Sequence, residues 1–368
     1  MRQFSTAGSS LLDKAAPESF SSRMEAERAR NYTECPHIDL SFTRKFLPTV
    51  YVLVFIIGAS ANVCGLRSVY RSWKKMGNIN VFVLNLGVAD LLYVSTLPFL
   101  VSYYAANSRW VFGQTFCKIM RFCFNLNLYG SIGFLTCISL YRYLGIVHTM
   151  RVMGKINTTM SVAISALVWT LVFVQILPDM YFDKSKPNSS ESCFDTTTDQ
   201  WITDYLSYSL GWTVTGFVIP LIIILLCYGH IIVVLANRAN VDSLLKQRCL
   251  KLVIMLTVLF SICFIPYHIF RNLNLKTRIL KMEGTCYKSF DRIYVAHQVC
   301  RGLVCLNSAI NPLIYLVAND EFLMRLHNMS KQARLSLMQL SGVVIYRRPQ
   351  EVDSLADTRQ ETEGPKSN

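Results

Sequence analysis

Charged residues are scarce in this chain. Asp, Glu, Lys and Arg make up only 16% of its 368 residues, whereas soluble domains carry about 25%. Hydrophobic residues make up 52%. This deficit of charge argues against an ordinary soluble domain and indicates a chain whose solvent is lipid. The first residues also lack an apolar run, so we expect no cleavable signal peptide.

Several kinds of chemistry are also missing. No Gly-rich phosphate loop precedes a helix and no His/Cys cluster has metal-ligand spacing, so the sequence does not favour an enzyme. No lysine occurs between residues 289 and 330, which excludes a light-driven pump with a retinal lysine on its seventh helix. Transporters usually show inverted repeats, and none is visible. The net charge of +14 is typical of a basic surface facing anionic lipid headgroups, and we expect no nucleic-acid partner.

Seven segments are long enough and poor enough in charge to cross a bilayer, which takes roughly 20 apolar residues. Among them only Asp90, Arg121 and Arg301 are charged. The segments are 46–66, 81–106, 119–141, 156–178, 205–237, 252–270 and 293–319. The sequence therefore predicts an all-α membrane protein, a seven-transmembrane helix bundle with a short amphipathic eighth helix.

The segments outside the spans set the orientation. Lys and Arg are more frequent in the first, third and fifth loops than in the others, which favours an outside N-terminus at the plasma membrane. We expect an extracellular tail (1–45), the bundle (46–318), an amphipathic surface helix (319–331) and a cytoplasmic tail (332–368). Sequons at Asn31 and Asn188 fall outside and are expected to be glycosylated. Two other sequons, at Asn157 and Asn328, fall inside.

Four of the 12 cysteines lie on the proposed outer side, and four cysteines allow three pairings. We expect Cys117–Cys193, which would pin the long fourth loop over the bundle mouth, and Cys35–Cys286, which would tie the tail to the last loop. Free thiols are the alternative.

Polar residues inside the spans form two groups at different depths. A charge at mid-bilayer costs roughly 2.5–3.5 kcal/mol, so each one needs a reason. The inner group and its flanking prolines supply a marker residue or motif in every span: Asn62, Asp90, Arg142, Trp169, Pro220 with Tyr228, Pro266, and Asn311-Pro312-Leu313-Ile314-Tyr315. In this order they resemble the signatures of rhodopsin-like G-protein-coupled receptors over nearly the whole bundle.

The resemblance implies roles for these positions. Activation and G-protein contact would involve Arg142, Tyr228, Pro266, Asn311, Pro312 and Tyr315. Pro266 and Pro312 remove helix donors and create kinks, as a swinging helix requires. Asp90 with Asn311 could hold an allosteric sodium ion, the alternative being a hydrogen-bonded carboxylate. Tyr141 replaces the family's usual acid before the arginine.

The outer group contains three arginines, Arg121, Arg271 and Arg301, on three different spans. Arg301 lies ten residues before Asn311, or roughly 15 Å along a helix, so all three should reach one level. The helices offer no acid to neutralise them, and Asp195 is the nearest plausible partner. A polyanion would compensate through bidentate hydrogen bonds, and phosphate fits best. Side chains that could stack on a base are Phe124, Tyr129, Tyr294 and Tyr104. A vestibule that serves only loop packing is the alternative.

A narrower resemblance rests on the motifs at 264–271 and 298–303, with 127–131 and 193–197 in support. They are similar to the His-x-x-Arg/Lys and Gln-x-x-Arg signatures of metabotropic purinoceptors, in the ADP- and ATP-responding branch. This implies an extracellular nucleotide agonist. The expected contacts are Arg121, Phe124, Tyr129, Asp195, His268, Arg271, Asn274, Arg278, Tyr294, His297, Gln298 and Arg301. Asn125 stands where close relatives often carry histidine.

The resemblance also implies partners. We expect a heterotrimeric G protein of the Gq class, with a second class left open, then phospholipase C and a calcium rise. Arrestin would bind the phosphorylated tail, and membrane lipid surrounds the bundle. No cofactor is expected besides the sodium ion. The alternative function is a rhodopsin-like receptor for another anion, such as a carboxylate lipid or an acidic peptide.

Overall fold

Seven helical segments cross the bundle in the part of the chain that the structure describes. The computed structural model describes residues 41–71, 78–147, 156–185, 192–237 and 243–317, without the side chains of 243–253, 256 and 313–317. Six of the seven segments are long and apolar enough to span a membrane. The seventh, α11 (Ser289–Val317), is not among them, and it carries the polar residues His297, Gln298 and Arg301. The predicted seven-helix bundle is confirmed.

The helices outrun the predicted spans. The first span begins α2 (Ser41–Arg71) five residues early, the third is α6 (Gln114–Val147), and the sixth is α10 (Ser243–Met282). Counting charge finds only the apolar part of a helix, because hydrogen bonding can continue beyond the hydrocarbon core. The predicted eighth helix (319–331), the cytoplasmic tail and the sequons at Asn31 and Asn188 lie outside the described residues.

Three predicted spans are not regular helices. The second is divided into α4 (Ile79–Val94) and α5 (Leu97–Ala105). Pro98 follows the break, and the hydroxyl groups of Ser95 and Thr96 donate to the carbonyls of Leu92 and Tyr93. These local bonds compete with a continuous helix.

The fourth span is α7 (Thr158–Ile176) followed by a 3₁₀ turn, η1 (Leu177–Met180), which contains Pro178. The fifth runs through η2 (Asp199–Trp201), α8 (Ile202–Thr213), the π-helical segment η3 (Val214–Val218) and α9 (Ile219–Asn237), with Pro220 just after the π segment. A π-bulge shifts the facing of the residues that follow it, and such bulges often accompany functional sites.

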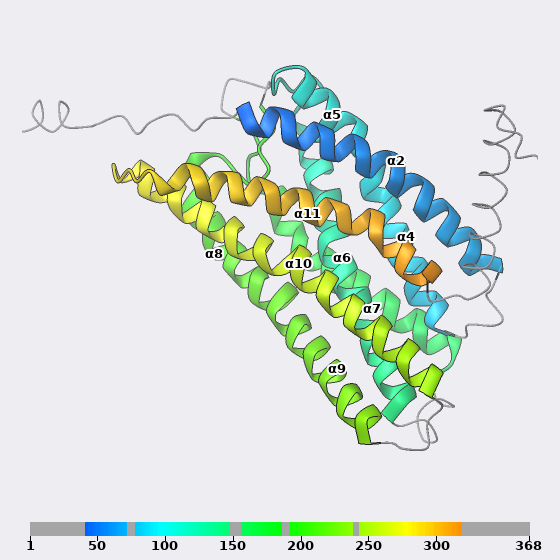
Figure 1. The fold of residues 1–368 in the computed structure, drawn as a ribbon. Coiled ribbons are helices and arrows are strands. Elements are labelled where there is room, and N and C mark those ends of the chain that lie inside the picture. The colour runs from blue at the N-terminus through cyan, green and yellow to red at the C-terminus, as the bar shows by residue number, and fades with distance from the viewer. Residues whose placement is uncertain (1–40, 72–77, 148–155, 186–191, 238–242, 318–368) are drawn as a thin grey trace, which may run out of the picture. The chain divides into compact units, whose positions relative to one another are not determined.

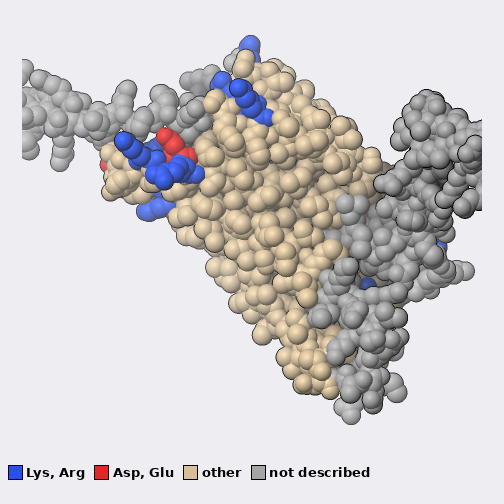
Figure 2. Space-filling model, viewed as in Figure 1, with Lys and Arg blue, Asp and Glu red and all other residues tan. Residues whose placement is uncertain are grey.

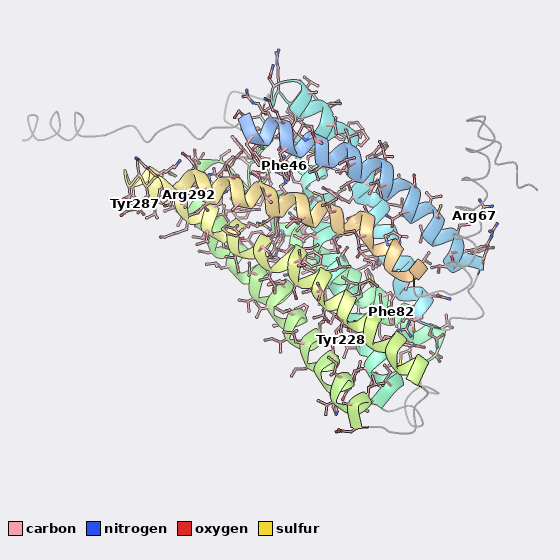
Figure 3. The ribbon with its side chains drawn as sticks, viewed as in Figure 1. Phe46, Arg67, Phe82, Tyr228, Tyr287 and Arg292 are labelled. Atoms are coloured by element: carbon pink, nitrogen blue, oxygen red, sulfur yellow. A yellow bond between two sulfur atoms is a disulfide. The ribbon has the colours of Figure 1, made fainter. Side chains whose placement is uncertain are left out.

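The helices pack around one apolar core that runs along the bundle. Figure 1 shows α2 beside α11 and α11 beside α10, while α6 lies behind them and contacts α4, α7 and α9. Large side chains in the core include Tyr51, Tyr93, Phe134 and Phe264, each at most 1% exposed. Figure 2 shows that the middle of the visible face carries no Lys, Arg, Asp or Glu, whereas charged side chains gather at one end. Figure 3 places Tyr287 and Arg292 at that same end.

Candidate functional site

One disulfide marks the end of the bundle where the polar site is built. Cys117, at the start of α6, is bonded to Cys193 as predicted, with Cα atoms 5.8 Å apart. We call this the disulfide end of the bundle. The bond holds the segment after Cys193 against α6. Cys286 is also disulfide-bonded, and its predicted partner, Cys35, lies outside the described residues.

The three predicted arginines converge at the disulfide end. Arg121, Arg271 and Arg301 come from α6, α10 and α11 and are each 2–3% exposed. Two rings connect them. The Arg301 guanidinium lies 5.8 Å from the Phe124 ring and that of Arg271 5.9 Å from the Tyr267 ring. The two ring centroids are 6.2 Å apart, so the arginines face a common space.

Asp195 faces this space from the disulfide-bonded segment, as the sequence predicts. Its carboxylate is 3.3 Å from Nη1 of Arg301. Partial burial raises the pKa of Asp195, but the positive charge of Arg301, followed by His297 and Arg121, outweighs it and leaves that pKa below its ordinary value. Arg121 donates from Nη2 to the Cys193 carbonyl at 2.9 Å. The segment is therefore held to the arginines by both backbone and side chain.

Arg271 has a partner that the sequence prediction missed. Its Nη2 donates to the Tyr205 hydroxyl at 2.9 Å, and that hydroxyl donates to Asp179 at 2.9 Å. Asp179 also pairs with Lys184 at 2.8 Å, and both side chains are at most 1% exposed. The expectation that no helix supplies an acid near the arginines is thus wrong, because Asp179 lies in η1. Lys184, expected to be an ordinary loop charge, is buried.

Many polar atoms of the site are buried without a hydrogen-bond partner among the described residues. They are Nε of Arg121, Arg271 and Arg301, Nη1 of Arg271, both ring nitrogens of His268, Nδ1 of His297, Oε1 of Gln298 and the Tyr129 hydroxyl. Buried polar atoms are normally satisfied, so a group of them points to a bound polar molecule. Since arginine nitrogens are donors only, the best match is an anion.

Aromatic rings surround these donors. His268 stacks on Phe217 at 4.3 Å, and His297 stacks on Tyr267 at 5.9 Å. Tyr129 packs edge-on against Trp212 at 4.7 Å. Tyr294, on α11, accepts a hydrogen bond from the Thr43 hydroxyl of α2 at 3.3 Å. The predicted contact residues thus come together from α2, α6, α8–η3, α10 and α11.

A fourth arginine closes the rim. Arg278 donates to the Thr196 hydroxyl and the Thr197 carbonyl, each at 2.9 Å, and contacts Asp199 at 2.5 Å. Asn274, one helical turn earlier, is buried, and its carbonyl accepts from the Thr277 hydroxyl. Arg278 therefore fastens the segment after Cys193 to α10.

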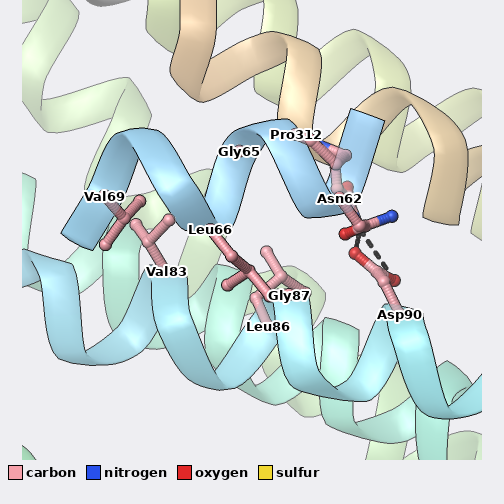
Figure 4. A pocket seen from close by; sticks show the side chains of 10 residues that line it. Asn62, Gly65, Leu66, Val69, Val83, Leu86, Gly87, Asp90 and Pro312 are labelled. Atoms are coloured by element: carbon pink, nitrogen blue, oxygen red, sulfur yellow. Dashed lines mark hydrogen bonds between the residues drawn. The ribbon is translucent and has the colours of Figure 1, made fainter. Parts of the chain in front are cut away.

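A second polar cluster lies midway along the bundle. Asp90 accepts hydrogen bonds from Asn311 at 3.1 Å and Asn127 at 2.8 Å, and Ser308 donates to Asn127. Figure 4 shows Asp90 beside a cavity of about 20 Å³ that Asn62 and Pro312 also line, room for one or two water-sized molecules. The predicted pairing of Asp90 with Asn311 is confirmed. The side chain of Tyr315 lies outside the described part.

The opposite end of α6 carries Arg142. Tyr141, which stands in place of an acid there, packs edge-on against Phe82 at 6.4 Å. Tyr228 accepts a hydrogen bond from Ser139 at 2.7 Å, and the Tyr143 hydroxyl lies 3.1 Å from His230 Nδ1. Hydrogen bonds and rings thus join α6 to α4 and α9 near Arg142.

Comparison with known proteins places this architecture. Residues 61–315 match the model of the 7 transmembrane receptor (rhodopsin family). The chain is 37% identical to purinoceptor 1 of Gallus gallus over 88% of this chain and 90% of that protein. It is 38% identical to the Homo sapiens protein of that name, over 82% of this chain and 81% of the relative. It is also 36% identical to 2-oxoglutarate receptor 1 of Rattus norvegicus, over 78% and 85%.

The chain belongs to the rhodopsin family of seven-transmembrane receptors. Within that family it is a member of the purinoceptor group, as the motifs around His268 and Gln298 predicted. It is therefore a receptor and not an enzyme, pump or transporter. Six apolar spanning helices within the described residues agree with a multi-pass membrane protein.

Proposed function

We propose that the receptor is activated by an extracellular nucleotide, ADP or ATP, which binds at the disulfide end. The observation that carries the proposal is the convergence of Arg121, Arg271 and Arg301 with buried, unpartnered donor nitrogens. Phosphate oxygens accept from forked guanidinium groups with good geometry. The names of the purinoceptor relatives agree with this ligand class. The N-terminus and the disulfide end would then face outside.

The proposed mechanism is a shift in population between two packings of the bundle. Phosphates would draw the three arginines together and relieve their mutual repulsion. The movement would pass along α10, which contains Pro266 in its interior, and proline is a common kink point. The opening would expose Arg142 and the basic stretch 246–251 to a Gq-class G protein, with arrestin binding the phosphorylated tail afterwards.

A second candidate is a receptor for a dicarboxylate. It is favoured by one observation, the 36% identity to a relative named 2-oxoglutarate receptor 1. Carboxylates also pair with guanidinium forks. The three-arginine site with its rings suits a phosphorylated aromatic molecule better, since a dicarboxylate needs no stacking surface.

The deciding experiment is intracellular calcium in cells that express the receptor, beside mock-transfected cells. Cells are challenged with ADP, ATP, UDP, UTP and 2-oxoglutarate, with and without a Gq inhibitor. We expect an inhibitor-sensitive response to ADP or ATP only in receptor-expressing cells. A response to 2-oxoglutarate alone would replace the first proposal by the second. Silence to all five, with surface expression verified, would refute both.

We also propose that Asp90 and Asn311 hold a sodium ion. The residues fit such an ion, because Oδ1 of Asn62 and of Asn311 are buried without hydrogen-bond partners among the described residues. Sodium supplies positive charge that balances Asp90, while Asn127 and Asn311 keep that carboxylate oriented. Oxygen ligands are those a hard cation prefers.

Replacing external sodium by choline is expected to raise agonist potency several-fold in the wild type, because an ion bridging α4 and α11 favours the resting packing. In Asp90→Asn this sodium dependence should disappear. Agonist dose–response curves in the two salts measure both. A wild type indifferent to sodium, or an Asp90→Asn variant that keeps the full dependence, would refute the site.

A further inference from the structure

One buried carboxylate joins five segments of the chain at the disulfide end. Asp179 of η1 accepts hydrogen bonds from Lys184 at 2.8 Å, from Tyr205 of α8 at 2.9 Å and from Asn125 of α6 at 3.2 Å. Lys184 also donates to the Thr196 carbonyl. Through Tyr205 the set reaches Arg271 of α10. A structural ion pair needs only two of these partners, so the extension to an arginine of the candidate site requires a further reason.

The direction of the hydrogen bonds gives that reason. A phenol has a single hydrogen to donate, and the Tyr205 hydroxyl uses it toward Asp179. Its oxygen is thereby turned to accept from Nη2 of Arg271. The guanidinium also lies over the rings of Tyr205 at 5.9 Å, Trp212 at 5.7 Å and Tyr267 at 5.9 Å. Arg271 is therefore held in one place although its Nε and Nη1 have no partner among the described residues.

The two acids near the arginines act in different ways. Asp195 contacts Arg301 directly, so an anion that binds Arg301 must share it with that carboxylate. Asp179 is instead paired with Lys184 and reaches Arg271 only through a neutral phenol. The charge of Asp179 is thus neutralised by Lys184, and Arg271 keeps its own charge for a ligand.

We propose that Asp179, acting through the Tyr205 hydroxyl, is the positioning residue that holds Arg271 ready for an anionic ligand. Lys184 compensates the charge of Asp179, and Asn125 links the same carboxylate to the helix that carries Arg121. The proposal rests on the proposed function in assuming that Arg271 contacts the ligand. Pre-organising a long side chain removes an entropic cost of binding.

Tyr205→Phe tests the proposal, because it removes one oxygen and leaves the Asp179–Lys184 pair in place. We expect agonist potency in the calcium assay to fall about tenfold, the range for one hydrogen bond to a charged group. Tyr208→Phe is the matched control, since that hydroxyl donates to the Gln175 carbonyl three residues further along α8. It should leave potency unchanged. Wild-type potency in Tyr205→Phe would overturn the proposal.

A double-mutant cycle separates positioning from a general structural role. In the Arg271→Ala background there is nothing for Tyr205 to position, so Tyr205→Phe should cause no further loss of potency. An equal loss in both backgrounds would mean that Tyr205 acts by some other route, and the proposal would be wrong. Asp179→Asn, which keeps an acceptor for the phenol, should lose less potency than Tyr205→Phe.

Failure of the proposed function is distinguishable from failure of this inference. If the wild type responds to no nucleotide, only the proposed function is refuted. Melting temperatures of the ligand-free, detergent-solubilised receptor then decide the inference, using Tyr205→Phe, Arg271→Lys and the double variant. Decreases that do not add support the link, whereas additive decreases overturn it.

Discussion

Replacing Arg301 by alanine is expected to lower agonist potency about 100-fold. Removing one partner of a buried, hydrogen-bonded charge pair costs roughly 2–5 kcal/mol, and 1.4 kcal/mol is a factor of ten. Arg301 is only 3% exposed, so bulk water screens little of its interaction with a bound anion. Calcium dose–response curves, normalised to surface expression, measure the effect. Equal potency in Arg301→Ala and wild type would remove the basis for the anion site.

Three control variants assign the cause of that loss. Arg301→Lys keeps the charge and loses the fork, so an intermediate potency is expected. Lys118→Gln removes a cation from the same end of α6 that contacts Met180 and Asp183 instead, and it should change potency little. Arg301→Ala also leaves Asp195 unpaired. If that alone caused the loss, the double variant Arg301→Ala/Asp195→Asn would recover potency, and we expect that it does not.

The number and order of the helices could be predicted because lipid leaves a strong signal in the sequence. A backbone in hydrocarbon must satisfy its own hydrogen bonds, so each charge-poor stretch of sufficient length indicates one helix. The ends of the helices could not be predicted in this way. The break before Pro98 and the π segment before Pro220 depend on local bonds and packing, and proline alone does not specify which irregularity forms.

The candidate site was predictable where residues share a helix face. His268 and Arg271 are three residues apart, and Arg301 follows His297 by four, so the helical period alone brings them together. Asp179 and Lys184 escaped prediction for a physical reason. Each stands at the edge of an apolar segment, where a charge is ordinarily solvated. Their burial results from the closing of the disulfide-bonded segment over η1, which no local pattern encodes. Pro178 before Asp179 was the only available signal.

Breaking the Asp179–Lys184 pair is expected to destabilise the receptor more than any other single substitution outside the helix core. Asp179→Leu leaves a buried, uncompensated ammonium group, and such losses cost roughly 3–5 kcal/mol. The double variant Asp179→Leu/Lys184→Met removes both charges and should recover most of that stability, because an apolar pair of similar volume often replaces a buried ion pair at little cost. Asp199→Asn is the control, since Asp199 is 65% exposed and exposed pairs contribute about 0–1 kcal/mol.

The pH dependence of these variants tests the same charge independently. Burial lowers the pKa of Lys184, and Asp179 offsets only part of that effect. Without Asp179 the pKa falls further, so the folded variant releases a proton that the unfolded chain still binds up to about pH 10.4. The unfolded state then binds more protons, and stability must rise with pH. The melting temperature of Asp179→Leu should therefore move toward that of the wild type between pH 7 and pH 9, while the double variant should show no such recovery. An Asp179→Leu deficit that stays constant over this range would mean that the lost stability comes from packing rather than from the stranded charge.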